Sequence, residues 1–241
     1  DYTGEAKKSF LRLFMYHVKQ AGGLGLHAGS KRVRVRRERD DDPTEVGQLF
    51  LGLSATGKST LTAHGLGLED RDGEGTTMLQ DDVCGLLPDG TVIGSEGRGL
   101  YLKTAGLDAE EQSTVYDAVT HESAVLENVD VAEDGAVDFD SDRYTTNGRA
   151  AVLREHLASA ADDEIDLGRV DQVFFITRNP AMPPVARLPP ESAAAAFMLG
   201  ESIETSAGDP SRAGESVRVV GTNPFIVGSE GEEGNRFRDL V

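Results

Sequence analysis

The stretch LFLGLSATGKSTLTAHG, residues 49–65, is an apolar run followed by glycines, a lysine and two hydroxyl residues. Gly52, Gly57, Lys58 and Ser59 have the spacing of a phosphate loop, in which backbone N–H groups surround phosphate oxygens. In that motif the lysine binds the β- and γ-phosphates and the hydroxyl binds Mg²⁺. Because a strand-like run precedes the loop and a helix is expected from Lys58, the stretch predicts nucleotide binding.

Length and composition indicate a globular protein. The chain has 241 residues, of which 38% are hydrophobic, enough for one large domain or two small ones. It has no apolar run of about 18 residues and no signal-peptide pattern, so we expect a soluble, cytoplasmic protein without a membrane partner. Its one cysteine, Cys84, excludes an internal disulfide and is expected to be a small buried residue. The chain starts at Asp1 rather than at a methionine, which we interpret as a fragment of a longer protein.

Acidic residues dominate the charge. Asp and Glu total 42 against 24 Lys and Arg, a net charge of -18, and they are spread along the chain. A surface of this kind repels a phosphate backbone, so we expect no nucleic-acid partner. A cytoplasm at high salt would explain the composition, because dissolved ions screen repulsion among the carboxylates.

The high-salt interpretation predicts how the protein responds to KCl. Screening weakens the self-repulsion of the folded state, so we expect a higher melting temperature in molar KCl than at low ionic strength. Thermal denaturation at the two salt concentrations measures this difference. A protein that melts at a higher temperature without salt would contradict the interpretation.

Apolar periodicity predicts helices over residues 5–20, 110–126 and 190–199, and a helix that begins at Lys58. Strands are expected in LGLHAGS, which carries His27, in residues 48–53, and in TTMLQDD, which ends in Asp81 and Asp82. Residues 169–177 read as a buried strand, and hairpins are expected around residues 88–90 and in NVDVAEDGAVDFD. The strongly charged residues 31–45 read as a solvated loop or hairpin.

This mixture predicts an α/β fold built on a mixed sheet. We divide the chain at residue 45. Residues 1–45 would contain the end of an N-terminal domain with a metal-site helix and strand, and residues 46–241 would form a nucleotide-binding domain truncated at its C-terminus.

Several polar residues are candidates for chemistry. Asp81 and Asp82 close a strand downstream of Lys58, where phosphate-loop proteins place carboxylates that organise Mg²⁺. Lys7 and Lys8 are adjacent in a chain with only six lysines. A lysine desolvated near a metal ion can lose its proton and become a ligand.

The segments YTGEAKK, LGLHAGS, FLGLSATGKST, QDDVCG, SEGRGLYLK, YTTNGR and FFITRNPAMPPVARL occur in this order. Together they resemble the ATP-dependent phosphoenolpyruvate carboxykinases, from Tyr2 to about Gly208. The resemblance implies a mixed-sheet mononucleotide-binding domain of the carboxykinase type with a phosphate loop. It also implies a carboxy-lyase of gluconeogenesis that converts oxaloacetate and ATP into phosphoenolpyruvate, ADP and CO₂.

The resemblance further implies roles for individual residues. Mn²⁺ would be held by Lys8, His27 and Asp82, and Mg²⁺ by Ser59 and, through water, by Asp81. ATP would be bound by Gly52, Leu53, Ser54, Ala55, Thr56, Gly57, Lys58, Ser59, Thr60, Gln112 and Arg149. The organic acid would contact Tyr2, Lys8 and Arg149, and the catalytic set would be Lys8, Lys58, Asp82, Lys103 and Arg149.

The sequence departs from the family pattern at three of these places. Ala55 replaces a glycine, Gln112 stands where an acidic residue is expected, and SEGRGLYLK is one residue longer than usual before Lys103. Two other hypotheses therefore stay open: a different phosphotransferase, such as a serine kinase of carrier proteins, and a nucleotide-binding module without catalysis. The oligomeric state is also open, with a monomer slightly favoured.

Overall fold

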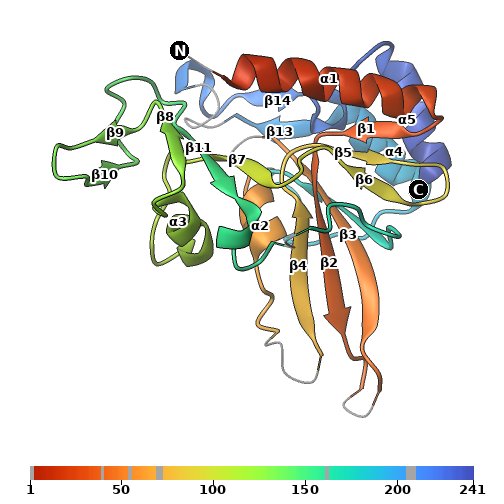
Figure 1. The fold of residues 1–241 in the computed structure, drawn as a ribbon. Helices are drawn as coiled ribbons and strands as arrows, with labels where there is room; N and C mark the ends of the chain where they lie inside the picture. Colours follow the sequence, from red (N-terminus) through yellow and green to blue (C-terminus); the bar gives the residue numbers. More distant parts are fainter. Residues whose placement is uncertain (1–2, 39–40, 54–55, 69–72, 161–162, 205–209) are drawn as a thin grey trace.

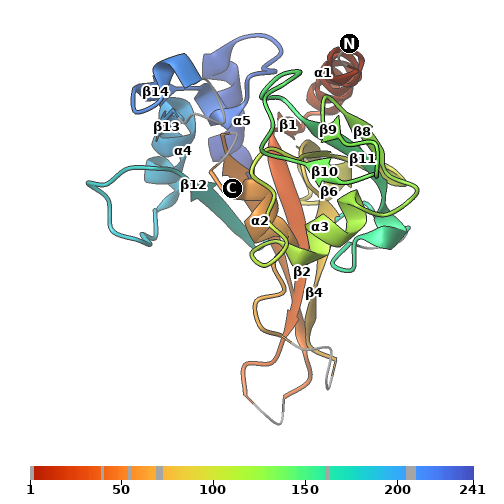
Figure 2. The same ribbon diagram turned by 90° about the vertical axis from the view of Figure 1, so that its left-hand side faces the viewer.

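The computed structural model describes residues 3–38, 41–53, 56–68, 73–160, 163–204 and 210–241. Its central feature is a four-stranded sheet with the strand order β12-β3-β2-β4. Figure 1 shows β4, β2 and β3 side by side, and Figure 2 labels β12. In this sheet β2 (Ala28–Val35) pairs antiparallel with both β3 (Thr44–Gly52) and β4 (Gly75–Gln80). The fourth strand, β12 (Gln172–Ile176), runs parallel to β3. The predicted α/β class with a mixed sheet is confirmed.

The short helix α2 (Lys58–Ala63) follows β3 and packs on this sheet, with its start at the predicted residue. Helix α2 lies close to β2 at Gly29. A Cβ atom at this glycine would lie 2.3 Å from Oγ1 of Thr62. Any larger residue at position 29 would push the helix outward. Gly29 therefore fixes the spacing between α2 and the sheet.

A second layer is formed by α1 (Gly4–Gln20) and a three-stranded antiparallel sheet. The sheet contains β1 (Leu24–Leu26), β5 (Cys84–Leu86) and β6 (Val92–Gly94). Leu11, Met15 and Val18 form the buried face of α1, which confirms the helix predicted over residues 5–20. Cys84 is 0% exposed, as expected, and burial raises the pKa of its thiol to about 12.

A third sheet lies on the side of β4 that faces away from α4 and α5 (Figure 2). Its strands, in spatial order, are β7 (Gly99–Lys103), β11 (Arg149–Leu153) and β8 (Val125–Glu127). The helix α3 (Ser113–Val119), the turn η1 (Arg154–His156) and the hairpin of β9 (Asp130–Val131) and β10 (Val137–Asp138) adjoin it. Leu100, Leu102, Ala150 and Val152 of this sheet share a core with Ala118 and Val119 of α3.

The C-terminal elements pack beside β12 and β1. They are α4 (Pro190–Leu199), β13 (Glu201–Ile203), η2 (Pro210–Arg212), β14 (Ser216–Arg218), η3 (Val220–Thr222) and α5 (Glu230–Leu240). The bounds of α4 match the helix predicted over residues 190–199. Phe197 of α4 stacks on Phe237 of α5 with their ring centres 4.3 Å apart, in the same core as Leu49 of β3.

Two predicted elements differ from the structure. The helix predicted over residues 110–126 is limited to α3, and the prediction is wrong for Val125 and Leu126, which together with Glu127 form β8. These three residues pair with β11, and this pairing across the sheet overrides their helical preference. Residues 169–177 do contain a strand, but β12 lies at the sheet edge and Phe174 is 39% exposed, so it is not a fully buried strand.

The prediction of a solvated segment over residues 31–45 is wrong for the first part of that segment. Lys31 and Val33 are 0% and 4% exposed. Both belong to β2, which lies inside the sheet between β3 and β4, so its side chains are covered more completely than those of an exposed hairpin. The division at residue 45 stays a prediction, although β2 and β3 on its two sides pair with each other.

Within the described residues, no helix has both the length and the apolar character needed to cross a membrane.

Candidate active site

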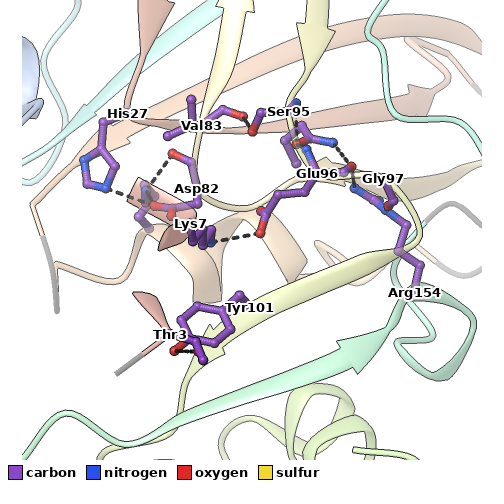
Figure 3. Close-up of polar contacts among 12 residues, drawn as sticks. Thr3, Lys7, His27, Asp82, Val83, Ser95, Glu96, Gly97, Tyr101 and Arg154 are labelled. Carbon is purple, nitrogen blue, oxygen red and sulfur yellow. Dashed lines mark hydrogen bonds and ion pairs between the residues drawn. The ribbon is translucent and has the colours of Figure 1, made fainter. Parts of the chain in front are cut away.

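Asp82, just after β4, lies at the centre of a polar cluster (Figure 3). Its Oδ1 atom is 3.1 Å from Nε2 of His27 and 3.5 Å from Nζ of Lys58. Its Oδ2 atom is 3.0 Å from Nζ of Lys7. His27 lies between β1 and β2, Lys58 begins α2, and Lys7 lies on α1. The fold thus brings three side chains from distant positions of the chain onto one carboxylate.

The surroundings of Asp82 favour its ionised form. Burial alone would raise the pKa of the carboxyl group. The charge of Lys58, the hydrogen bond from His27 and the charge of Lys7 outweigh burial and hold this pKa well below its usual range. Asp82 is therefore an anion at neutral pH.

Lys7 also pairs with a second carboxylate. Its Nζ atom is 2.9 Å from Oε1 of Glu96, which lies in the loop between β6 and β7 and is 8% exposed. Burial would lower the pKa of Lys7, but the charges of Glu96 and Asp82 raise it, so Lys7 keeps its proton. Burial raises the pKa of Glu96 despite the charge of Lys7. The second oxygen of Glu96, Oε2, is buried without a hydrogen-bond partner among the described residues.

Arg154 holds the backbone behind this cluster (Figure 3). Its side chain is 1% exposed. Nε donates to the carbonyl oxygen of Gly97, and Nη2 donates to the carbonyl oxygens of Leu79 and Glu96, the latter at 3.1 Å. One guanidinium therefore ties the end of β4, which precedes Asp82, to the loop that carries Glu96.

The orientation of His27 is set by its second ring nitrogen. Nδ1 lies 2.7 Å from the carbonyl oxygen of Thr222 in η3. A carbonyl oxygen can only accept, so Nδ1 carries the proton of this hydrogen bond. Nε2 faces Asp82 at 3.1 Å and donates to its carboxylate when it carries a proton; in the neutral imidazole with its proton at Nδ1, Nε2 would instead offer its lone pair to a metal ion. This is the arrangement of a histidine metal ligand, whose other nitrogen commonly donates to a carbonyl group.

The loop between β3 and α2 has glycines where its backbone requires them. Gly57 has φ of +95°, in the left-handed region that favours glycine. A Cβ atom at Gly52 would lie 2.5 Å from Oγ1 of Thr56, and this hydroxyl donates to the carbonyl oxygen of Leu53 at 2.7 Å. Lys58, which follows, is 8% exposed and directs its amine toward Asp82.

A cavity beside α2 gathers further predicted residues on its wall, namely Ser59, Thr60, Asp81, Lys103 and Gln112. Asp81 is 6% exposed, and its Oδ1 atom is buried without a hydrogen-bond partner in the described part of the chain. Arg149 is the register partner of Lys103 across β11 and β7. Burial first, and then the charge of Arg149, lower the pKa of Lys103. Two adjacent cations in this place favour an anionic ligand.

Four predicted positions need separate mention. The lysine paired with Asp82 is Lys7, whereas Nζ of Lys8 lies 3.2 Å from Oε1 of Glu5 and its side chain is 36% exposed. Neighbouring residues point in different directions around a helix, so the two lysines occupy different environments. Tyr2 lies outside the described residues, as do Ser54 and Ala55 of the loop.

The donor set around Asp82 fits a divalent cation. His27 offers an imidazole nitrogen, Asp82 an ionised carboxylate, and Asp81 an unpartnered oxygen, which are ligand types that Mn²⁺ and Mg²⁺ accept. No group of three His, Cys, Asp or Glu side chains forms a cluster in the ranges that the structure describes. The third protein ligand of the predicted Mn²⁺ site is of another type, since the family resemblance implies Lys8.

Comparison with known proteins places this geometry in a family. The sequence model of phosphoenolpyruvate carboxykinase matches residues 1–240. The chain belongs to the phosphoenolpyruvate carboxykinase family.

Curated relatives carry the name phosphoenolpyruvate carboxykinase (ATP). The Aeropyrum pernix protein is 44% identical over 245 residues, which cover 100% of this chain and 48% of the relative. The Mesorhizobium japonicum protein is 30% identical over 249 residues, covering 100% and 42%. The protein of Staphylococcus aureus strain Newman is 31% identical over 202 residues, covering 83% and 34%. This carboxykinase chain thus spans about half, or less, of the length of these relatives.

Sequence reasoning missed three residues of the carboxykinase site. Glu96 stands in the segment SEGRGLYLK, and an acidic residue in that segment could have been proposed as a partner for Lys7. Arg154 donates to backbone carbonyl oxygens, and Thr222 accepts from His27 through its own carbonyl oxygen, so no side-chain pattern in the sequence indicates either role. Only the folded chain brings them to the site.

Proposed function

We propose that this chain contains the phosphate-loop and metal-binding core of an ATP-dependent phosphoenolpyruvate carboxykinase. The enzyme would convert oxaloacetate and ATP into phosphoenolpyruvate, ADP and CO₂. The proposal includes a cytoplasmic location and a working environment of high salt, which the acidic composition supports.

One observation carries the proposal. Lys58, directly after the left-handed Gly57, and His27 both meet the carboxylate of Asp82, at 3.5 and 3.1 Å. A phosphate-binding lysine and a metal-ligand pair on one carboxylate support joint binding of a nucleotide and a divalent ion.

The reaction breaks the bond between the methylene carbon of oxaloacetate and the carboxylate that it carries; CO₂ leaves, and the electron pair of that bond forms the enolate of pyruvate. The enolate oxygen then bonds to the γ-phosphorus of ATP while the bond to the β-phosphate oxygen breaks and releases ADP. Lys58 would bind the β- and γ-phosphate oxygens, and Arg149 would spread the charge of the transferring phosphoryl group. Lys7 stays protonated between Glu96 and Asp82 and would bind an anionic oxygen of the organic acid.

Metal ions complete the proposed site. Mn²⁺ would be held by His27, Asp82 and Lys8, whose Nζ atom would have to turn from Glu5 to the metal ion. Mg²⁺ would be held by Ser59 and, through water, by Asp81. When bound, such ions act as Lewis acids that offset negative charge on the enolate and phosphoryl oxygens. The hydrogen bond from His27 to Thr222 would keep Nε2 oriented as a ligand.

The direct test has two parts, carried out on this chain. Calorimetry measures ATP binding in Mg²⁺, and a coupled assay measures ADP release that depends on oxaloacetate and Mn²⁺. Both signals are expected, and both should be lost in Lys58→Met. ADP release without oxaloacetate would favour a different phosphotransferase, and ATP binding without any turnover would favour a nucleotide-binding module.

Replacing His27 separates metal binding from nucleotide binding. His27→Ala removes one ligand of Mn²⁺ but no group of the phosphate loop, so we expect Mn²⁺ affinity to fall at least about 10-fold and ATP affinity to change less than about 3-fold. Calorimetric titrations with each ligand measure the two changes. His17→Ala, an exposed histidine on α1, is the control and should change neither. Equal losses of both affinities in His27→Ala would contradict the proposed metal site.

A further inference from the structure

Lys31 is a fully buried cation outside the cluster around Asp82. Its side chain is 0% exposed. Nζ donates to the carbonyl oxygens of Leu61, at 2.8 Å, and of His64. It also lies 5.8 Å from the centre of the Phe50 ring. No carboxylate is paired with it among the described residues, unlike Lys7 and Lys19.

Both acceptors of Lys31 lie at the C-terminal end of α2. The last carbonyl groups of a helix have no partner within the helix, and they form its negative end. α2 has only 6 residues, too few to be stable without contacts to the rest of the protein. The ammonium of Lys31 supplies both hydrogen bonds and a complementary charge at this end.

The same strand holds α2 at a second point. Gly29, two residues before Lys31 on β2 and thus on the same face, makes the close approach to Thr62. Thr62 donates its hydroxyl to the carbonyl oxygen of Lys58 at 2.8 Å. One face of β2 therefore positions α2 in two ways. Gly29 sets the distance between the helix and the sheet, and Lys31 sets the position of the helix along the helix axis.

Placing an ammonium here is unfavourable in itself, because burial lowers the pKa of Lys31 to about 8. An apolar side chain of similar size, such as methionine, would fill the space without that penalty. What methionine cannot supply is a pair of directed donors for the two carbonyl groups.

We infer that Lys31 is a positioning residue of the phosphate loop, which fixes α2 on β2 so that Lys58 and Ser59 lie where they can bind phosphate. This inference rests on the proposed phosphate binding at Lys58. Helix α2 begins with these two residues, so a shift of its C-terminal end moves both of them.

The test uses Lys31→Met with inorganic triphosphate and Mg²⁺ as the probe, which removes any contribution of the adenine. We expect triphosphate affinity to fall at least about 10-fold, since a small misplacement of binding groups has effects of this size. Hydrogen exchange at the amides of residues 58–64 should accelerate, while exchange in α1 and β5 stays unchanged. The matched control is Lys19→Met, which breaks the ion pairs with Glu232 and Glu233 between α1 and α5 and should leave triphosphate affinity unchanged.

Each outcome decides a separate question. Wild-type affinity in a folded Lys31→Met protein, or exchange that accelerates evenly over the whole chain, would overturn the inference. If Lys31→Met does not fold, Lys31→Gln replaces it. We expect its triphosphate affinity to fall at least about 3-fold, because the shorter amide reaches the two carbonyl groups less well. An unchanged triphosphate affinity of Lys31→Gln would overturn the inference. If the wild-type chain binds no triphosphate, the proposed function fails, and local exchange at residues 58–64 still decides whether Lys31 anchors the helix.

Discussion

Asp82→Asn should lower the affinity for Mn²⁺ by at least about 100-fold, because it replaces an ionised ligand by a neutral amide whose oxygen is a weaker donor. It should also lower the free energy of unfolding by about 2 to 3 kcal/mol, since Lys7, Lys58 and His27 lose the anion that they share. Titration calorimetry measures the first change and urea denaturation the second.

The difference in the free energy of unfolding between wild type and Asp82→Asn depends on pH. The pKa of Asp82 is lower in the folded protein than its ordinary value of 3.8, so its contribution to stability is complete above that pH and is lost as the pH falls below it. The stability difference between wild type and Asp82→Asn should therefore shrink in acid. The control is Asp89→Asn, which makes the same chemical change at a carboxylate in the β5–β6 turn that accepts from the amide of Thr91. Equal Mn²⁺ affinities of wild type and Asp82→Asn would disprove the metal site.

Arg154→Met should destabilise the fold by about 3 to 5 kcal/mol, which is a large part of the stability of a typical domain. The variant would remove the guanidinium donor from the carbonyl oxygens of Leu79, Glu96 and Gly97. The first two would keep the side-chain amide of Gln80 as a donor, at 2.7 and 2.9 Å. The end of β4 and the loop before β7 would then separate, so Mn²⁺ affinity should fall as well. Urea denaturation and Mn²⁺ titration on the same preparation measure the two effects.

An exposed arginine provides the comparison for Arg154. Arg143 has a side chain that is 68% exposed and an ion pair with Asp130 at 3.2 Å. Arg143→Met should change stability by less than about 1 kcal/mol, as exposed ion pairs contribute little. If the two methionine variants unfold at the same urea concentration, Arg154 does not hold this part of the fold together.

Local sequence patterns predicted the elements that depend mainly on their own residues. The apolar spacing of Leu11, Met15 and Val18 gave α1, and the proline at position 190 marked the first residue of α4. The strand β4, which ends at Gln80 directly before Asp81 and Asp82, was predicted because its apolar run precedes two carboxylates.

The errors occur where distant parts of the chain decide the structure. Val125 and Leu126 follow a helical pattern but pair with β11, and Lys31 lies in a charged segment but is buried inside the sheet. Contacts between distant parts of the chain also explain which residues of the candidate site could be predicted. His27, Lys58 and Asp82 were named from motifs, whereas the contributions of Arg154 and Thr222 arise from contacts with backbone carbonyl groups that no motif contains.

The parallel pairing of β12 with β3 also bears on how the protein folds. Gln48 and Gln172 are side-chain partners across this pair although they are 124 residues apart. Only residues 36–43 separate β2 from β3 in the sequence, but joining β12 to β3 requires a loop of more than 100 residues to close, with a larger loss of chain entropy. During synthesis, β2, β3 and β4, which lead to Lys58 and Asp82, can therefore assemble before β12 has left the ribosome, and β12 joins them afterwards.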